Sequence, residues 1–349
     1  MRVAVALSGG VDSAVAALLL LRAGHHVVGV TFATPHTRDP APVAGALGIE
    51  LFRVDVSAVF ERRVIDYFRA EYLAGRTPSP CVLCNLHVKF GLFREAALET
   101  CRAEALATGH YARTRRAGAR TFLRAGVDPE HDQSYFLCML SGAALDRVRF
   151  PVGGMSKSEV RALARAADLP VDASRSSRDV CFAPEGYRSV FEGSPAARPG
   201  PVFDHTGRVL GLHDGLFNYT VGQRRGVPVA AGYPLYVQRL DAGTNSLILA
   251  PRRFLYARSV LVRPFNTISF ARPRRPLRVF ARVRYRQPGA CATLLPSPRS
   301  FGDAPADAVE LRFDEPVFAP APGQFAAVYI GDLLLGGGPI RDVLFPRPA

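Results

Sequence analysis

A six-residue segment near the start of the chain has the composition of a phosphate-binding turn. SGGVDS (residues 8–13) follows the β-branched run Val3–Leu7 and precedes an apolar stretch with helical character. A glycine-rich turn between a strand and a helix directs backbone N–H groups at an anion, and the two serines add hydroxyl donors. It matches neither a Walker A loop nor the G-x-G-x-x-G pattern. The segment predicts phosphate binding, with Asp12 placed to hold Mg²⁺; a plain turn is the alternative.

Three cysteines lie where a reactive thiol is expected. Cys81 and Cys84 stand at the start of a predicted helix, whose N-terminus lowers the pKa of a thiol. Cys181 lies in RDVCF, residues 178–182. Three interpretations are open: structural thiols, metal ligands, or a redox-active pair of Cys84 and Cys181 that carries sulfur. A single Cys-x-x-Cys is weak support for zinc, which takes four ligands. The remaining cysteines are expected to pack in the interior: Cys101, Cys138 and Cys291.

Strand and helix patterns alternate along the first 110 residues, which predicts an α/β domain with a parallel sheet. A further helix is expected to open at the capping box Ser156–Glu159 and to run to about Ala167. The predicted strands are Val3–Leu7, His26–Phe32, Leu51–Val54 and Ala105–Thr108, and the predicted helices are Asp12–Ala23 and Leu86–Thr100.

Composition changes near GSPAARPGP (residues 193–201), and beyond it short strands and Gly/Pro turns replace the helical periodicity. A second break is expected within residues 263–276. We therefore predict three domains: an α/β domain with a helical extension at residues 1–195, a small central β domain at 196–265, and a β-barrel-like domain at 266–349.

The formal net charge of +14 favours a polyanionic partner. Residues 251–300 contain twelve arginines and no acidic residue. A strand over residues 277–286 would place four of them on one face, which suits an RNA backbone; the alternative is the solvated outside of a barrel. YTVGQRRG (residues 219–226) either reaches the nucleic acid or is a basic surface turn. The four arginines of the strand face are Arg278, Arg282, Arg284 and Arg286.

No run approaches the ~18 apolar residues that a membrane span needs, and the first residues lack the pattern of a signal peptide. We therefore expect a cytoplasmic protein without a membrane partner. A disulfide framework is not expected in that compartment, which favours catalytic or metal-binding roles for the cysteines.

The turn at residues 8–13 resembles the PP-loop of ATP pyrophosphatases, whose adenine nucleotide alpha hydrolase-like domain has a parallel sheet. Those enzymes split ATP into AMP and pyrophosphate and adenylate a carbonyl oxygen. Nearly the whole chain resembles the tRNA-specific 2-thiouridylase (MnmA) family through an ordered set of segments. Besides the PP-loop these are GRTPSPCVLCNLHVKF (75–90), ATGHYAR (107–113), HDQSYFL (131–137), FPVGGMSKSEVR (150–161), RDVCFAPEGYRSVF (178–191), NYTVGQRRG (218–226), RVRYRQ (282–287) and PGQFAAVYIGDLLLGGGPI (322–340).

The resemblance implies ATP-dependent 2-thiolation of the wobble uridine of tRNA, with ATP and Mg²⁺ as cofactors. The C2 oxygen would be adenylated, and a persulfide on Cys181 would supply sulfur, with Cys84 as the nucleophile. A cysteine desulfurase or a sulfur-relay protein would be the donor, and tRNAs for Lys, Glu and Gln the substrates. The implied ATP-binding residues are Ala6, Leu7, Ser8, Gly9, Gly10, Val11, Asp12, Ser13, Phe32 and Gly109; Ser79, Pro80 and Cys81 would lie against the target base; and His110, His131, Asp132, Gln133, Arg284, Tyr285 and Gln324 would contact the tRNA.

Two departures from the family stand out. Many members have Asp, a candidate general base, where this chain has Cys81. With that third thiol, the alternative is that Cys81, Cys84 and Cys181 hold an iron–sulfur cluster with one open iron. The segment 33–48 is also short for the family, which leaves the adenine-side contacts open.

Two other functions stay open on the residues alone. One is a different PP-loop synthetase that acts on a small acid and needs neither Cys84 nor Cys181. The other is an RNA-binding protein with a vestigial nucleotide site. The all-β second half and the arginine-rich strand disfavour the first, and the intact SGGVDS and both cysteines disfavour the second.

Overall fold

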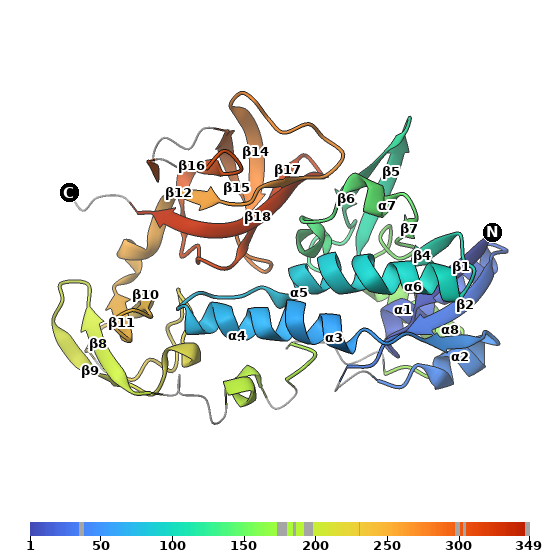
Figure 1. Cartoon of the computed structure of the whole chain (residues 1–349), viewed down its shortest axis with the longest axis horizontal. Helices are drawn as coiled ribbons and strands as arrows, with labels where there is room; N and C mark the ends of the chain where they lie inside the picture. Colours follow the sequence, from blue (N-terminus) through green and yellow to red (C-terminus); the bar gives the residue numbers. More distant parts are fainter. Residues whose placement is uncertain are drawn as a thin grey trace.

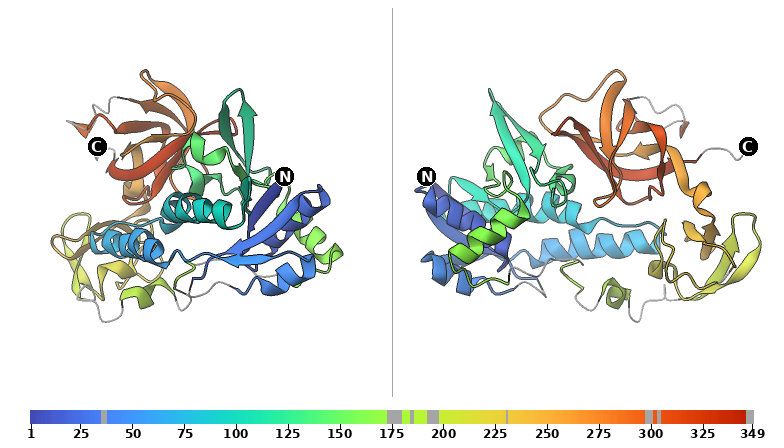
Figure 2. Two further views of the ribbon diagram at one scale, coloured as in Figure 1. Left: turned by 45° about the vertical axis from the view of Figure 1, so that its right-hand side comes forward. Right: turned by 180° about the vertical axis from the view of Figure 1, so that it is seen from behind.

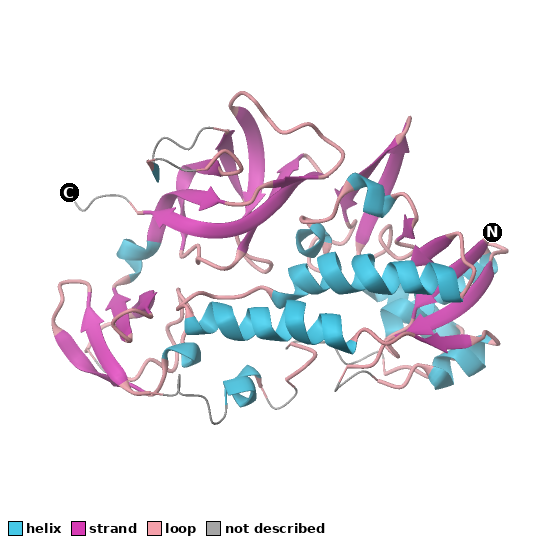
Figure 3. Cartoon of the chain, in the orientation of Figure 1, coloured by secondary structure: helices cyan, strands magenta, loops and turns pink. Residues whose placement is uncertain are grey.

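The computed structural model describes residues 1–34, 38–172, 180–183, 186–191, 198–229, 231–296, 301–302 and 305–345. Figure 1 shows an α/β region at the N-terminal end, a small β region and a β-barrel. Most helices belong to the α/β region, and the other two regions are built mainly of strands (Figure 3). The predicted domain boundary at residue 195 lies outside the described residues, as do residues 178–179 and 184–185 of the Cys181 segment.

The N-terminal region is built on a parallel sheet with strand order β3-β2-β1-β4-β7, which confirms the predicted α/β fold. Apolar side chains of α1 and α8 pack on one face of β1, and side chains from the helices that follow β3 pack on the other. Burial on both faces explains why its strands are almost entirely apolar. The elements are β1 (Arg2–Ala6), α1 (Val11–Arg22), β2 (His26–Thr31), α2 (Ala41–Leu47), β3 (Leu51–Arg53), β4 (Ala105–Ala107), η3 (Ser134–Leu137), α7 (Gly142–Leu145), β7 (Val148–Arg149), α8 (Lys157–Ala166) and η4 (Tyr187–Phe191).

The predicted capping box opens α8. The backbone N–H of Glu159 donates to Ser156 Oγ at 3.3 Å, and the backbone N–H of Ser156 donates to the Glu159 carboxylate at 2.7 Å. These reciprocal bonds fix the first helical residue as Lys157.

Two helical segments extend from the sheet toward the β regions and lie side by side (Figures 1 and 2). The second begins at Pro80, before the predicted start at Leu86, because residues 80–83 already form a helical turn. Both contain π-helical stretches, which hydrophobic periodicity does not reveal. No helix of the described residues is long and apolar enough to span a membrane. The segments are α3 (Ser57–Phe60), η1 (Glu61–Ile65) and α4 (Asp66–Leu73), then α5 (Pro80–Leu83), η2 (Cys84–Leu92) and α6 (Phe93–Thr100).

The central region is a sheet with strand order β10-β11-β8-β9 around its own apolar core. It is all-β apart from two short 3-10 turns, as predicted. Its elements are β8 (Gly200–Asp204), β9 (Val209–His213), η5 (Leu216–Asn218), β10 (Tyr236–Asp241), β11 (Ser246–Ala250) and η6 (Arg252–Leu255).

The C-terminal region is an antiparallel barrel, closed because β12 pairs with both β16 and β18. The predicted boundary at residue 265 falls too late, since β12 is already a barrel strand. The proline-rich stretch 263–276 connects strands within the barrel instead of separating two domains. The strands are β12 (Tyr256–Val262), β13 (Asn266–Thr267), β14 (Leu277–Arg282), β15 (Ala290–Leu295), β16 (Val309–Phe318), β17 (Phe325–Ile330) and β18 (Leu333–Leu344).

A hairpin of β5 (Ala112–Ala117) and β6 (Arg120–Ala125) joins the N-terminal region to the barrel, because β6 pairs with β18. Asp332, in the turn before β18, pairs with Arg113 and Arg124 of the hairpin at 2.7 and 2.6 Å. The sequence analysis did not foresee this shared sheet, which fixes the barrel relative to the α/β region.

Candidate functional site

Residues 8–10 lie in the turn between β1 and α1, and residues 11–13 form the first turn of α1, so the segment links strand to helix as predicted. The N–H of Ser8 donates to Ser13 Oγ at 3.2 Å, and Ser13 Oγ donates to the carbonyl of Gly10 at 3.0 Å, so the turn closes on itself. Gly9 has φ +69°, a left-handed conformation that favours glycine. Gly10 stands at the N-cap of α1 and offers no capping side chain. The first N–H groups of α1 are therefore free of an N-cap side chain, which suits a bound phosphate.

The residues predicted to bind ATP come together at one edge of the sheet. Residues 6–13 follow β1, Phe32 follows β2 and Gly109 follows β4, and neighbouring parallel strands end at the same edge. A Cβ atom on Gly109 would lie 2.6 Å from backbone atoms of Asp12 and Ser13, so the chain after β4 touches the turn directly. Phe32 packs edge-on against Phe93, with ring centroids 4.8 Å apart.

Lys157 enters the same site, which the sequence analysis did not predict. Its ammonium group donates to both carboxylate oxygens of Asp12 at 2.6 and 2.7 Å, and the Tyr111 hydroxyl donates to Oδ1 at 2.7 Å. Lys157 is only 7% exposed, and its capping box places it at the first turn of α8. The composition offered one indication of a special role for Lys157, because it is one of two lysines in a chain whose other basic residues are mostly arginines.

Asp12 offers no free carboxylate to a metal ion in this arrangement. Both oxygens accept hydrogen bonds from Lys157, so an ion bound there would displace the ammonium group. No group of three or more His, Cys, Asp or Glu residues in the described ranges has the arrangement of a metal site. The Lys157 ammonium therefore supplies the positive charge beside the turn, and Mg²⁺ held by Asp12 together with the ATP phosphates stays a prediction.

The three candidate thiols lie in one neighbourhood. Cys84 is buried where α5 meets η2, whereas Cys81 and Cys181 are exposed. Phe182, next to Cys181, packs against the core that contains Cys84. Burial raises the pKa of the Cys84 thiol to about 12, and negative charge on Cys181 and Cys81 adds to that rise. For Cys84 the lowered pKa predicted from the helix N-terminus is wrong, because desolvation of the buried thiolate outweighs the helix dipole.

These thiols do not form a metal site. All three belong to the described residues, and no cluster of ligands among those residues could hold a metal ion. The iron–sulfur alternative therefore has no support in this structure.

Lys89 is a second cation that the sequence analysis left unassigned. It lies in η2, five residues after Cys84, and the wide π-helical turn brings residues five apart toward one side. After burial, its charge is the next influence on the pKa of the three thiols, which it lowers. The described residues include no ion-pair partner for Lys89. Its charge is therefore available to a thiolate.

The segment predicted to face the target base is held by the barrel. Gln324 Nε2 donates to the carbonyls of Thr77 and Pro78 at 3.2 and 2.9 Å, just before Ser79, Pro80 and Cys81. The carbonyl of Pro322 accepts from the N–H of Thr77 at 2.9 Å. Gln324 thus contacts the chain that carries the thiols, a role that its sequence position alone did not indicate.

Four residues predicted to contact tRNA are engaged in bonds within the protein. His110 is buried, bonds the Thr108 hydroxyl at 2.8 Å, and has a pKa held well below its usual range by burial. His131 lies 3.0 Å from a carboxylate oxygen of Asp128. Gln133 accepts a backbone N–H, and Asp132 is 5% exposed.

The four arginines of residues 277–286 do not form the predicted common face. Strand β14 ends at Arg282, so the alternation stops there. Arg278 pairs with Asp314 on the neighbouring barrel wall, Arg282 pairs with Asp132 at 2.8 Å, and Arg284 donates to the carbonyl of Val221 at 2.6 Å. Arg286 remains exposed. Three of these arginines therefore make intramolecular contacts with acidic or carbonyl groups of other segments, which the local sequence cannot show.

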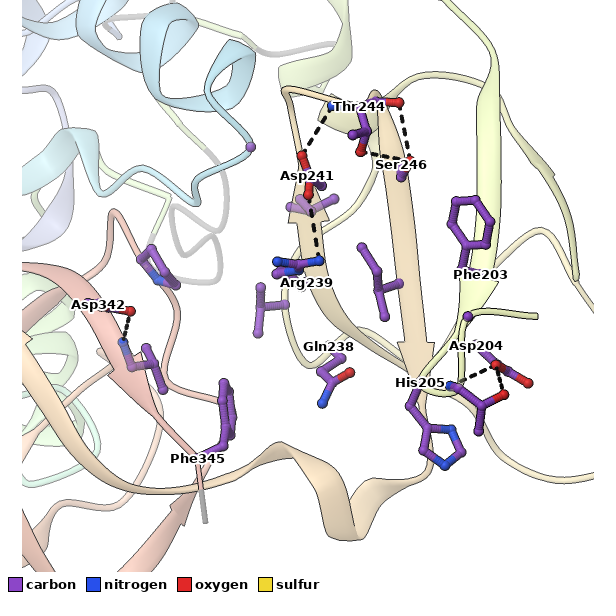
Figure 4. Close-up of a pocket in the computed structure, with 18 of the residues that line it drawn as sticks. Phe203, Asp204, His205, Gln238, Arg239, Asp241, Thr244, Ser246, Asp342 and Phe345 are labelled. Atoms are coloured by element: carbon purple, nitrogen blue, oxygen red, sulfur yellow. Dashed lines mark hydrogen bonds and ion pairs between the residues drawn. The ribbon is translucent and has the colours of Figure 1, made fainter. Parts of the chain in front are cut away.

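A cavity of about 760 Å³ lies between the central sheet and the barrel (Figure 4). Asp204, Asp241 and Asp342 line it together with Phe203 and Phe345. None of its lining residues belongs to the predicted ATP, thiol or tRNA sets. It is therefore separate from the site built around residues 8–13 and the cysteines.

Three sequence families match the chain in succession. The family described as tRNA methyl transferase HUP domain matches residues 1–185, the tRNA methyl transferase PRC-barrel domain matches 190–251, and the aminomethyltransferase beta-barrel domain matches 257–340. A tRNA-specific 2-thiouridylase MnmA from Acidithiobacillus ferrooxidans is 43% identical over 351 residues, covering 97% of both chains. The chain belongs to the MnmA family. The MnmA enzyme of Chlorobaculum tepidum is 39% identical, covering 98% of this chain and 95% of its own.

A further MnmA relative, from Syntrophotalea carbinolica, is 43% identical and covers 96% of this chain and 97% of its own. The MnmA family therefore spans all three regions, not the PP-loop region alone. Among solved structures, a 4-thiouridine synthetase–RNA complex with bound ATP aligns at a TM-score of 0.32 and 20% identity, covering 55% of this chain and 49% of its own. A similarity this low does not bear on function.

Proposed function

We propose that this protein uses ATP to replace the C2 oxygen of the wobble uridine of tRNA with sulfur. The observation that carries the proposal is the placement of Cys84 and Cys181 in one neighbourhood, in a chain with an intact phosphate turn and near-full-length similarity to MnmA enzymes. We further propose tRNAs for Lys, Glu and Gln as substrates and a cysteine desulfurase, directly or through a relay protein, as the sulfur source.

In the first step ATP binds with its phosphates at residues 8–13, beside the ammonium group of Lys157. The C2 oxygen of the uridine attacks the α-phosphorus, the bond to the β-phosphate breaks, and pyrophosphate leaves. The products are the O-adenylated base and pyrophosphate. N–H groups of α1 and the Lys157 cation stabilise the negative charge that develops on the phosphates.

In the second step the terminal sulfur of a Cys181 persulfide bonds to C2. The Cys84 thiolate attacks the Cys181 sulfur, the persulfide S–S bond breaks, and a Cys84–Cys181 disulfide forms. The electron pair of the broken bond stays on the transferred sulfur, and AMP leaves with the former C2 oxygen. A two-electron thiol reductant then restores both cysteines.

The thiol pKa values place a condition on this step. A pKa of about 12 leaves Cys84 protonated at neutral pH in the free protein. Cys84 must become more solvated, or move closer to a cation, before it can act as a thiolate. Lys89 is the cation already placed to act on it. We therefore expect substrate binding to rearrange this half of the site.

The test is thiolation of tRNA by Cys84→Ser and Cys181→Ser variants, measured as 2-thiouridine with ATP and a desulfurase-generated persulfide. We expect each variant to lose at least about 100-fold in rate, because each removes a reacting sulfur. Cys291→Ser is the matched control, since Cys291 was expected in the interior but is an exposed thiol on the barrel. Full activity in Cys84→Ser would contradict the persulfide scheme. Iron analysis of the active anaerobic protein should find no iron in stoichiometric amount.

A further inference from the structure

The segment RVRYRQ (residues 282–287) connects the barrel to both other regions. Arg282 Nη1 donates to Asp132 Oδ2 at 2.8 Å, and the two side chains are only 16% and 6% exposed. Asp132 is otherwise bonded inside its own turn, to the N–H of Gly126 at 2.9 Å and to the N–H and hydroxyl of Ser134 at 3.0 and 2.9 Å. A buried carboxylate that is held this rigidly fixes the arginine that pairs with it.

Arg282 also holds Tyr285. Its other terminal nitrogen donates to the carbonyl of Tyr285, and its guanidinium carbon lies 5.8 Å from the centroid of the Tyr285 ring. The ring packs on Phe136 with centroids 4.3 Å apart. The carbonyl of Phe136 in turn accepts from Asn85 Nδ2 at 3.2 Å, and Asn85 follows Cys84 in the chain. Arg282 therefore ties Tyr285 to the helix that carries the thiols.

The turn that contains Asp132 is bonded to the phosphate turn as well. Gln133 and Tyr111 exchange two hydrogen bonds, Gln133 Oε1 accepting at 3.0 Å and the N–H of Gln133 donating to the Tyr111 carbonyl at 2.8 Å. The Tyr111 hydroxyl then reaches Asp12. A connected path thus runs from the phosphate turn through Tyr111, Gln133 and the neighbouring Asp132 to Arg282 of the barrel.

We propose that Arg282 is a positioning residue, which acts through Asp132 to hold Tyr285 against the thiol-bearing helix and so sets where the target uridine sits. It does not bind a tRNA phosphate. The claim rests on the proposed function, because it takes tRNA as the substrate. Both terminal guanidinium nitrogens are used inside the protein, which leaves the exposed Arg286 as the arginine of this segment open to a phosphate.

Arg282→Gln, Asp132→Asn and the double variant test this role. The measurements are tRNA affinity at several KCl concentrations, the rate at saturating tRNA, and ATP affinity. Loss of one phosphate contact lowers the magnitude of the salt slope of log affinity by about 0.7 to 0.9, whereas a misplaced base lowers the rate. We expect each single variant to lose about 10- to 100-fold in saturated rate, with tRNA affinity, salt slope and ATP affinity unchanged. The double variant should be no slower than the slower single variant.

Arg286→Gln is the matched control and should lower the salt slope with the saturated rate retained. Arg282→Lys keeps the charge but cannot bond Asp132 and the Tyr285 carbonyl at once, so its saturated rate should fall as in Arg282→Gln. If a melting experiment shows that Arg282→Gln is unfolded, Arg282→Lys takes its place in the test. A lowered salt slope with a normal saturated rate in Arg282→Gln, or a normal rate in Asp132→Asn, would overturn the positioning role. Failure of the unaltered protein to bind or thiolate tRNA would instead overturn the proposed function.

Discussion

The phosphate turn and the thiol neighbourhood differ in how completely the free protein assembles them. Around the turn, every predicted residue stands at one sheet edge, and Asp12 already holds Lys157 and Tyr111 by hydrogen bonds of 2.6 to 2.7 Å. Around the thiols, Cys84 is buried and has a pKa of about 12, while Cys81 and Cys181 are exposed. The turn that we propose to bind ATP, the ATP half, is therefore preorganised, whereas the proposed mechanism requires the thiol neighbourhood, the sulfur half, to rearrange before it can react.

This difference has a chemical benefit. A thiolate or persulfide that is reactive in the absence of tRNA would be consumed by oxidants and other thiols. The phosphate turn can be ordered in the free protein without such loss, because backbone N–H groups do not react with oxidants or thiols. The variants below test whether the two halves can be impaired separately.

The largest loss confined to one half of the site is expected in ATP pyrophosphatase activity when Gly109 is replaced. Gly109→Ala places a Cβ atom 2.6 Å from the backbone of the turn, which forces the turn to move. Because a shift of about 1 Å costs on the order of 100-fold in rate, we expect that loss in ATP pyrophosphatase activity, with unchanged alkylation of Cys181. Gly154→Ala is the control, since a Cβ there meets no atom within 4 Å. Equal losses in both variants would argue against a tightly assembled turn.

A smaller loss is expected when Lys157 is replaced by Met. The variant leaves the Asp12 carboxylate beside the phosphates without its ammonium partner, which removes a charge-assisted bond and adds repulsion. A loss of about 1.4 kcal/mol corresponds to a tenfold weaker ATP affinity, which calorimetry would measure. Lys157→Arg retains the charge and should recover part of the affinity. Tighter ATP binding in Lys157→Met would show that Asp12 needs to be free.

Lys89→Met should affect only the sulfur half. Removing the cation raises the pKa of Cys181, so less thiolate is present at a given pH and alkylation slows several-fold near pH 8. Mass spectrometry of iodoacetamide-treated protein across pH gives the profile, which should move to higher pH. Lys157→Met serves as the matched control and should leave the profile in place. A profile that moves to lower pH would reverse the assigned sign.

The smallest expected effect is on stability. Ser156→Ala removes the side-chain half of the capping box and should cost about 1 kcal/mol, measured by denaturant unfolding. ATP affinity should fall slightly as well, because Lys157 is the first residue of the helix that the box fixes. Ser158→Ala, two residues along, removes a hydroxyl that lies 2.9 Å from Ser156 Oγ but leaves both bonds of the capping box, so it should cost less. A stability unchanged by Ser156→Ala would show that packing alone holds α8.

What the sequence predicted correctly follows from local rules. The apolar strand around Val3, the SGGVDS turn and the Ser156 capping box are each encoded within a few neighbouring residues, and each has the predicted place in the structure. The all-β, barrel-like character of the C-terminal region also followed from its short strands and turns, whereas its closure by the pairing of β12 with β18 did not.

What the sequence missed depends on partners far along the chain. The sequence suggests that Arg282 contacts a phosphate, but in the structure it pairs with Asp132, which lies 150 residues away in the chain. The position of Cys84 near a helix start suggests a lowered thiol pKa, but its burial in the folded chain raises that pKa instead. The proline-rich stretch after β12 suggests a domain boundary, but β12 pairs with β18 and therefore belongs to the barrel. Burial and long-range pairing are properties of the folded chain, and spacing alone does not carry them.

The most direct test of the contrast between the halves is the alkylation rate of Cys84 with and without bound tRNA and a non-hydrolysable ATP analogue, in a Cys81→Ser, Cys181→Ser background. We predict almost no reaction at pH 7.5 in the free protein and at least a tenfold faster reaction in the complex, because the buried thiol must become a thiolate. A rate that is equally fast in both states would contradict the account, since the sulfur half would then be assembled before tRNA binds.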